Sequence, residues 1–227
     1  MEPVYRVGTR RSPLAFKQTG EVLDKLRRYY PSLRLRIVGI DTCGDKDTKT
    51  PISKIEGSDF FTREIDKALM EGRIDFAVHS AKDLPDITRD GLTVAAVTES
   101  VDPRDALVSK YNLRLNELPL RATIGTSSRR RQEGLRKYRS DFRIIDIRGN
   151  IGKRLQELYV NDHLQAIIIA VAGLLRLKLA HKITQKVPLD ILAPHPLQGR
   201  LALVAGKDNK KLVKLLSTID SRESVRV

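Results

Sequence analysis

Short apolar runs alternate with longer amphipathic segments along the first half of the chain. A short apolar run bounded by turn residues is typical of a strand, whereas apolar residues that recur every three or four positions are typical of a helix. The pattern predicts helices over residues 14–29 and 60–70, and strands over residues 5–8, 33–40, 74–79 and 92–97. This alternation predicts an α/β fold with mixed, mostly parallel sheets and helices on both faces.

The second half repeats the alternation. The pattern predicts helices over residues 129–138 and 151–159, and strands over residues 123–125, 142–147, 165–171 and 201–205. The run at 165–171 is apolar on both faces, which is typical of a buried central strand.

Two segments without periodicity, residues 98–103 and 193–199, are predicted to be hinge crossings between two lobes. The first domain is then discontinuous, residues 1–98 plus 199–227, and the second, residues 103–193, is inserted into it. Two lobes joined by two such connections form a hinged cleft. The polar segment from Asp41 to Ser58 is compatible with a lid over that cleft and equally with a solvated loop.

The charge balance is strongly basic. The chain carries 42 Lys and Arg against 28 Asp and Glu, a formal net charge of +14, which attracts polyanions. Proteins that bind single-stranded nucleic acid usually add aromatic stacking platforms, yet Trp is absent and aromatic residues make up only 5% of this chain. Many cations also stand beside acids on predicted helices, where a solvated face explains them. We therefore expect no nucleic-acid partner.

Cysteine and histidine are scarce. A single cysteine, Cys43, excludes an intramolecular disulfide framework, and with only four scattered histidines we expect no metal centre. No N-terminal apolar stretch resembles a signal peptide, and the longest apolar run, residues 166–175, is too short to span a bilayer. The expectation is a cytoplasmic protein with no membrane partner.

Polar side chains follow the predicted strand over residues 74–79 at once, as His79, Ser80, Lys82 and Asp83. Ligands of open α/β sheets bind beyond the carboxyl ends of strands, which makes Asp83 the first candidate for a catalytic acid or base. The alternative is that Lys82 and Asp83 are solvated turn residues before Pro85. Groups of cationic residues, here called cationic tips, also follow other predicted strands. This recurrence favours the interpretation of Asp83 as a site residue over that of a solvated turn.

Two of those tips lie in the second half. Thr126, Ser127 and Ser128 are natural N-cap residues for a helix that begins beside Arg130 and Arg131, and such a helix start favours an anion. Neighbouring helical residues point about 100° apart, so Arg129 is expected outside the site. In the other tip Arg148 precedes Gly149 and Asn150, with Arg154 on the same helix face as Asn150. The expected ligand is small, strongly anionic and multidentate.

Several motifs in register make the chain closely resemble the porphobilinogen deaminase, or hydroxymethylbilane synthase, family. They cover nearly the whole chain, in family order. The matching stretches are residues 9–15, 75–85, 102–106, 125–132, 148–150, 166–177 and 198–199, the last being Gln198 and Gly199.

The resemblance implies two lobes like a type II periplasmic binding protein, with the active site between them. It also implies a transferase of tetrapyrrole and haem biosynthesis, which condenses four porphobilinogen molecules into a linear tetrapyrrole and releases ammonia. The substrate is thus an anionic pyrrole, and Asp83 corresponds to the family's catalytic aspartate. The positions that match cofactor- or substrate-binding residues of the family are Arg10, Ser12, Lys54, Lys82, Arg130, Arg131, Arg148, Arg154 and Arg176.

The sequence also departs from the family pattern. The family attaches a dipyrromethane cofactor to a cysteine of a third domain. This chain stops at Val227 before such a domain, so the attachment cysteine is not in it. The two alternatives are a minimal form of the enzyme and a catalytic core completed by a separate chain, and we expect this chain alone to turn over slowly or not at all. Ser58, Gln165 and Arg200 replace a lysine, an aspartate and a small residue. The alternative function is a non-catalytic two-lobed binding protein for an anionic small molecule.

Overall fold

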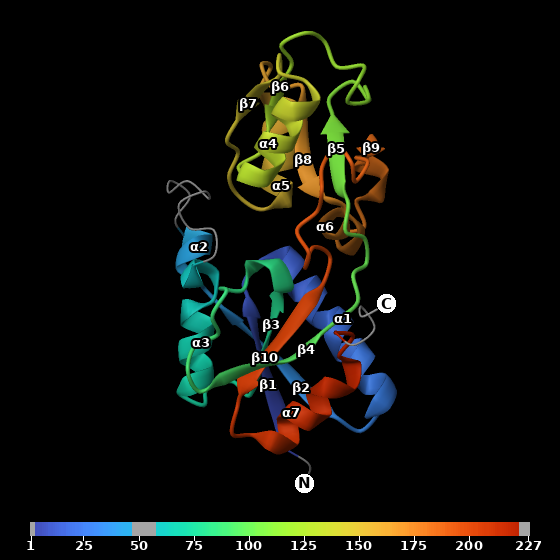
Figure 1. The fold of residues 1–227 in the computed structure, drawn as a ribbon. Helices are drawn as coiled ribbons and strands as arrows, with labels where there is room; N and C mark the ends of the chain where they lie inside the picture. The colour runs from blue at the N-terminus through green and yellow to red at the C-terminus, as the bar shows by residue number, and fades with distance from the viewer. Residues whose placement is uncertain (1–2, 47–57, 223–227) are drawn as a thin grey trace. The chain divides into compact units, whose positions relative to one another are not determined.

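The computed structural model describes residues 3–46 and 58–222. Lys54 and most of the segment expected to form a lid lie outside the described residues. The chain separates into two compact units, one made of Met1–Asp47, Gly57–Val101 and Arg200–Val227, and the other of Thr48–Glu56 and Asp102–Gly199. Each unit holds a five-stranded sheet (Figure 1).

The sheet of the first unit has the strand order β2-β1-β3-β10-β4. Strand β1 pairs in parallel with β2 and β3, whereas β10 pairs antiparallel with β3 and β4. Strand β10 therefore runs against the other strands. The strands are β1 (Val4–Arg10), β2 (Arg34–Ile40), β3 (Phe76–Ser80), β4 (Leu92–Val97) and β10 (Leu201–Gly206).

Helices cover both faces of this sheet. On one face Leu26 packs with Phe76 and Leu203. On the other face Ile65 packs with Ala77, the neighbour of Phe76 in β3, because successive strand residues point to opposite sides. The helical elements of this unit are α1 (Pro13–Tyr29), α2 (Cys43–Lys46), α3 (Arg63–Met70) and α7 (Lys210–Leu216), with the 3₁₀ turns η2 (Asp59–Phe61), η3 (Ala81–Asp83) and η5 (Ser217–Ile219).

The sheet of the second unit has the order β7-β6-β8-β5-β9, in which β5 runs against the rest. Its strands are β5 (Asp105–Ser109), β6 (Thr123–Gly125), β7 (Arg143–Ile145), β8 (Ala166–Ala170) and β9 (Gln185–Lys186). Its helical elements are α4 (Arg129–Tyr138), α5 (Ile151–Val160), α6 (Val171–Arg176) and η4 (Ala180–Lys182). Leu135 of α4 packs on one face with Ile168, and Leu158 of α5 packs on the other with Ile167.

The α/β class with mixed sheets and helices on both faces is confirmed. Several boundaries differ from the prediction. The predicted strand over 165–171 ends at Ala170, because the chain turns there into α6, and the predicted helix over 60–70 is divided into η2 and α3. The pattern did not predict β5, β9, α6 or α7. None of the helices in the two described ranges is long and apolar enough to cross a membrane.

Candidate functional site

Asp83 is fixed by a tight turn at the end of β3. The buried part of the strand ends at His79, and Ala81 begins the turn η3 with its backbone N–H bonded to the carbonyl oxygen of Arg200 at 3.0 Å. Ala81 is buried, and the N–H of Leu84 closes the turn on the Ala81 oxygen at 3.3 Å. The position of the Asp83 carboxylate therefore follows from a buried strand and one anchored turn.

The Asp83 side chain lines a pocket within the first unit. The other side chains that bring chemistry to this pocket are those of Arg10, Ser12, Gln18, His79 and Ser80, beside the ring of Phe61. Ser12 caps α1, because its Oγ accepts from the N–H of Ala15 at 3.2 Å, and Gln18 donates to the Ser80 hydroxyl at 2.8 Å. One pocket thus combines a guanidinium, hydroxyls, an imidazole and a carboxylate. Lys82 lies next to Asp83 in η3 and is partly buried.

The guanidinium of Arg10 is held by an acid of the same unit. Its Nη2 lies 2.5 Å from Asp45 Oδ1 and its Nε lies 3.3 Å from Oδ2, while Thr42 donates its hydroxyl to the same carboxylate at 2.8 Å. The guanidinium carbon also lies 4.5 Å from the centre of the Phe61 ring. Burial raises the pKa of Asp45, but the hydrogen bonds from Arg10 and Thr42 and the Arg10 charge outweigh it, so the net shift is downward.

His79 is a neutral imidazole in the same pocket. Its side chain is 5% exposed, and its Nε2 has no hydrogen-bond partner among the described residues. Burial, and secondly the positive charge of Arg10, lower the pKa of His79 to about 4. The ring is therefore uncharged at neutral pH.

In the second unit Arg130 and Arg131 converge on a buried acid at the start of β5. Arg130 Nη2 lies 2.6 Å from Asp105 Oδ2, and Arg131 Nη2 lies 2.7 Å from Oδ1. Gln198 also donates to Oδ1 at 2.9 Å. Asp105 is fully buried, which raises its pKa, but the two arginines lower the pKa further than burial raises it. Two cations thus share one internal carboxylate and keep a net positive charge.

The hydroxyls expected to cap α4 do not do so. Ser128 stands at the N-cap position, but its side chain makes no capping hydrogen bond, and Ser127 donates instead to the carbonyl oxygen of Ile147 at 2.6 Å. The Oγ1 of Thr126 accepts only a long contact of 3.4 Å from the Ser128 N–H. The three residues form the loop between β6 and α4, and Ser127 ties this loop to the segment after β7.

The tip after β7 has the expected local geometry. Gly149 has φ +92°, a conformation that favours glycine, and Asn150 caps α5 by accepting from the N–H of Lys153 at 3.0 Å. Arg154 donates to the Gly149 oxygen at 2.9 Å, so it braces the loop that carries Arg148. Asn150 thus caps the helix that follows the loop of Arg148.

Two further predicted residues belong to the second unit. Arg176, at the end of α6, donates to the Gly199 oxygen at 3.0 Å. Gln198 donates to the Pro103 oxygen at 2.6 Å and to Asp105, so it joins the segment before Gly199 to the start of this unit. The first unit therefore contains Asp83, Arg10, Ser12 and Lys82, and the second holds the other described candidates.

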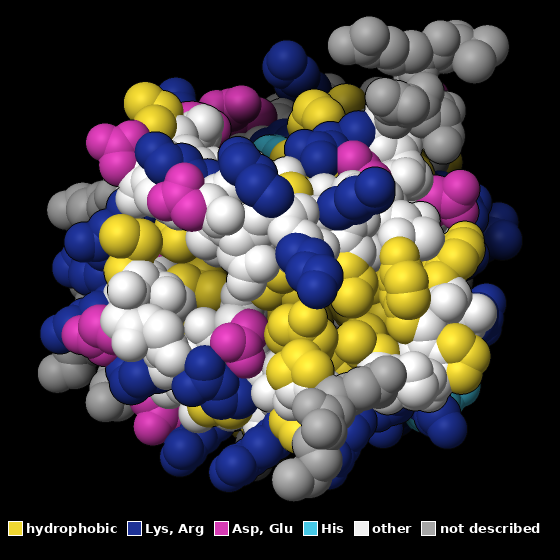
Figure 2. All heavy atoms as spheres, turned by 90° about the horizontal axis from the view of Figure 1, so that it is seen from below, with side chains coloured by type: hydrophobic (Ala, Val, Ile, Leu, Met, Phe, Trp, Pro, Cys, Tyr) yellow, Lys and Arg dark blue, Asp and Glu magenta, His cyan; other side chains and the backbone are white. Residues whose placement is uncertain are grey.

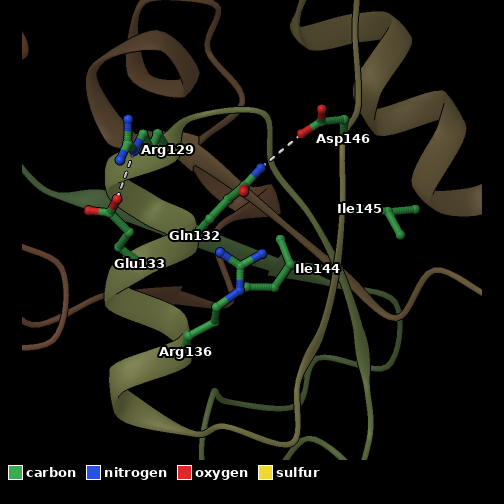
Figure 3. A pocket seen from close by; sticks show the side chains of 7 residues that line it. All are labelled: Arg129, Gln132, Glu133, Arg136, Ile144, Ile145 and Asp146. Carbon is green, nitrogen blue, oxygen red and sulfur yellow. Dashed lines mark hydrogen bonds and ion pairs between the residues drawn. The ribbon is translucent and has the colours of Figure 1, made fainter. Parts of the chain in front are cut away.

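A second pocket lies on the outer side of α4 and β7 and contains no predicted site residue (Figure 3). Arg129 points there toward Glu133, and its Nε lies 2.9 Å from the Glu133 Oε1. Gln132 donates to Asp146 at 2.8 Å. Arg129 therefore belongs to an exposed ion pair.

The basic side chains are dispersed on the face drawn in Figure 2. They are scattered over this face, several of them beside Asp or Glu, and the largest group of hydrophobic side chains lies right of its centre. On this face there is no continuous basic stripe. Among the residues described, no group of three His, Cys, Asp or Glu could hold a metal ion.

The departures from the family pattern have local roles in the structure. Gln165 accepts from the N–H of Thr123 at 2.7 Å through its Oε1, which joins the start of β8 to β6. Arg200 donates to the Thr98 oxygen at 3.3 Å and to the Ser221 hydroxyl at 3.4 Å. Ser58 caps η2 by accepting from the Phe60 N–H at 3.4 Å.

Sequence reasoning missed three residues that hold the predicted ones. Asp45 binds Arg10, and Asp105 binds both Arg130 and Arg131. Gln18 binds Ser80 in the pocket of Asp83. Gln18 left a signal, because it is a polar residue on the buried face of α1. Asp105 lies in a family motif. Asp45 left no signal, because it lies 35 residues from Arg10 in the sequence.

The two sheets, each with one reversed strand, define a two-lobed α/β fold of the type II periplasmic-binding class. The BvgS VFT2 domain of Bordetella pertussis matches with a TM-score of 0.54 at 16% identity, covering 96% of this chain and 87% of that one. The methionine binding protein MetQ matches with a TM-score of 0.53 at 15% identity, covering 95% and 89%. At these identities the likeness concerns the fold alone.

Sequence comparison gives the family. Residues 5–214 match the model described as porphobilinogen deaminase, dipyromethane cofactor binding domain. The porphobilinogen deaminase of Natranaerobius thermophilus is 43% identical over 219 residues, covering 96% of this chain and 70% of the relative. That of Deinococcus deserti is 44% identical over 218 residues, covering 94% and 70%. The chain belongs to the porphobilinogen deaminase family, as its motifs predict.

Proposed function

We propose that this chain catalyses the head-to-tail condensation of porphobilinogen into a linear tetrapyrrole, as a hydroxymethylbilane synthase of haem biosynthesis. Family membership supports the reaction class. The observation that carries the residue assignment is the pocket at the tip of β3, where the Asp83 carboxylate shares a lining with Arg10 and His79.

The residues of this pocket fit the dipyrromethane cofactor named by the family model. Such a molecule carries pyrrole N–H donors and several carboxylates. Arg10 matches a carboxylate, Asp83 accepts from N–H groups, and the pocket also holds a buried imidazole nitrogen without a partner among the described residues. Lys82, next to Asp83 in η3, adds a second cation beside the pocket. When bound, the cofactor supplies the pyrrole carbon to which the first substrate is joined.

Asp83 stabilises the positive charge that forms on the substrate. The substrate reacts with its aminomethyl group protonated: the bond between the methylene carbon and the nitrogen breaks, and neutral ammonia departs with the electron pair. The substrate is left as a cationic methylene-pyrrolenine, and a fixed carboxylate lowers the energy of that cation. The new carbon–carbon bond then forms and the attacked ring loses one proton, which restores its aromaticity. The turn η3 fixes Asp83 before the charge appears.

The arginines of the second unit bind the carboxylates of substrate and product. Each porphobilinogen adds an acetate and a propionate, so the growing chain becomes more anionic with every step. Arginine binds a carboxylate through two parallel hydrogen bonds. We assign this role to Arg130, Arg131, Arg148, Arg154 and Arg176, together with Lys54 and the loop residues Thr126, Ser127, Ser128, Gly149 and Asn150.

The test compares ammonia release by the wild type and Asp83→Asn, with any partner chain that supplies the cofactor-bearing domain present in both assays. The substitution keeps the shape of the side chain and removes its charge, so release should fall by at least about a hundredfold, in line with the loss of one preorganised charged group. Asp86→Asn is the matched control, because Asp86 is exposed and three residues away. Equal rates of release in the Asp83→Asn protein and the wild type would refute the role of Asp83.

A further inference from the structure

His79 carries a polar atom that the first unit leaves without a partner. The residue lies on β3, four positions before Asp83, and its side chain is 5% exposed. Its Nε2 is buried and meets no hydrogen-bond donor or acceptor of the described residues. Buried polar atoms in folded proteins are nearly always paired, so this nitrogen calls for a partner from outside the described residues.

The strand register puts His79 and Arg10 on the same side of the sheet. Gly8 of β1 is the register partner of Ala77 of β3 in parallel pairing. Two residues further along each strand stand Arg10 and His79, and residues two apart share a face. Both side chains line the pocket that Asp83 also lines.

The charges around the ring keep it able to accept a hydrogen bond. Burial and the positive charge of Arg10 hold the pKa of His79 near 4. Asp45 is bound to the Nε and Nη2 of Arg10 and to the Thr42 hydroxyl. A neutral imidazole has one nitrogen with a proton and one with a free electron pair.

We propose that His79 is a further ligand-positioning residue of this pocket, whose imidazole accepts a hydrogen bond from a pyrrole N–H of the bound molecule. The inference rests on the proposed function, which makes the ligand a pyrrole that carries carboxylates. Arg10 recognises the carboxylates and cannot distinguish a pyrrole from another five-membered ring. His79, in the pocket of Asp83, accepts a hydrogen bond from the ring N–H. A ring that lacks the N–H therefore binds less tightly.

The experiment uses two probes with the same carboxylates, a pyrrole dicarboxylate and the furan dicarboxylate of the same substitution. In furan an oxygen replaces the N–H. Calorimetric titration of the wild-type chain should show tighter binding of the pyrrole. His79→Phe should weaken pyrrole binding roughly two- to twelvefold, the range for one neutral hydrogen bond, and leave furan binding unchanged. His79→Gln keeps an acceptor and should retain part of the preference.

The outcomes separate this inference from the proposed function. If His79→Phe binds the pyrrole probe and porphobilinogen and keeps the wild-type preference for pyrrole over furan, the role of His79 is overturned and the proposed function stands. Failure of the wild type to bind either pyrrole would overturn both. Asp83→Asn, measured in parallel, gives the part of the preference that belongs to the neighbouring carboxylate.

A second measurement follows the His79 ring in the wild-type protein. In wild-type protein with isotope-labelled histidine, the nitrogen resonance of the unprotonated ring atom of His79 should move when porphobilinogen is added. His79→Gln identifies the resonance by its loss, and His163, exposed in a loop, is an internal reference. A resonance that stays in place at saturating porphobilinogen would overturn the inference.

Discussion

Arg10 holds the carboxylate of Asp45 at 2.5 Å, so a cation expected to bind ligand carboxylates already binds one from its own chain. The Arg10 and Asp45 side chains are 25% and 24% exposed, and the Thr42 hydroxyl donates to the same carboxylate. A ligand carboxylate therefore competes with Asp45 for the guanidinium.

The first prediction follows from this competition. Asp45→Asn should tighten the binding of an acetate- or propionate-bearing pyrrole about two- to fivefold, because a partly exposed ion pair contributes up to about 1 kcal/mol. Calorimetric titration measures the change. Asp41→Asn is the control, since the Asp41 ion pair with Arg11 is long, at 3.6 Å, and largely exposed. Weaker binding in Asp45→Asn would show that Asp45 orients Arg10 instead of competing with its ligand.

A second prediction concerns Asp105, which is buried between Arg130 and Arg131. Asp105→Asn leaves two arginines facing a neutral amide, and breaking a buried pair costs about 3–5 kcal/mol. Urea unfolding should show this loss in the free energy of unfolding. Glu133→Gln removes only the exposed partner of Arg129 and should change stability by less than about 1 kcal/mol. Similar small losses in both variants would contradict the role of the buried acid.

The same acid gives a pH dependence. Folding lowers the pKa of Asp105, so its contribution is complete above the unfolded pKa of about 3.9 and is lost as pH falls through the folded value. The stability difference between wild type and Asp105→Asn should stay constant near neutral pH and shrink below about pH 4.

The pattern of the sequence predicted the elements better than the partners of its charged residues. The helix over residues 129–138 and the strand over residues 123–125 agree with α4 and β6, because both have a clear period and local turn residues. The sequence predicts Asp83 as a catalytic candidate because Asp83 comes just after a buried strand. The pairing of Arg131 with Asp105 joins residues 26 positions apart, and no local pattern encodes such a contact.

The missed strands and helices have physical causes. Strand β5 begins with Asp105, and a charged residue at the first position of a strand looks like a turn in the sequence, although two arginines neutralise it in the fold. Helix α6 follows the apolar run of β8 without a polar break, so its first residue, Val171, was read as strand.

A third prediction uses two glycines at the start of α5. Gly149 has φ +92°, and a Cβ there would lie 3.0 Å from the Lys153 Cβ, so Gly149→Ala should cost roughly 1–2 kcal/mol and disturb the loop of Arg148. Gly152→Ala is the matched control, because its Cβ would meet only the Asn150 Oδ1 at 3.4 Å. It should be neutral or stabilise by up to about 1 kcal/mol. Thermal unfolding of both variants tests the sign, and loss of stability in both would contradict the argument.

The last prediction concerns His79 and acid. Its pKa is about 4 in the folded chain and about 6.5 in a free side chain, so the unfolded chain binds more protons between these values. Stability from the neutral ring is therefore complete above about pH 6.5 and is lost as pH falls toward 4, by roughly 3 kcal/mol in total. His79→Gln removes this titration, so the unfolding free energy of the variant should fall less over the same range. His163→Gln, at an exposed position, should keep the wild-type slope. Chemical unfolding at closely spaced pH values measures both slopes, and equal slopes in His79→Gln and the wild type would show that His79 is not buried in its neutral form.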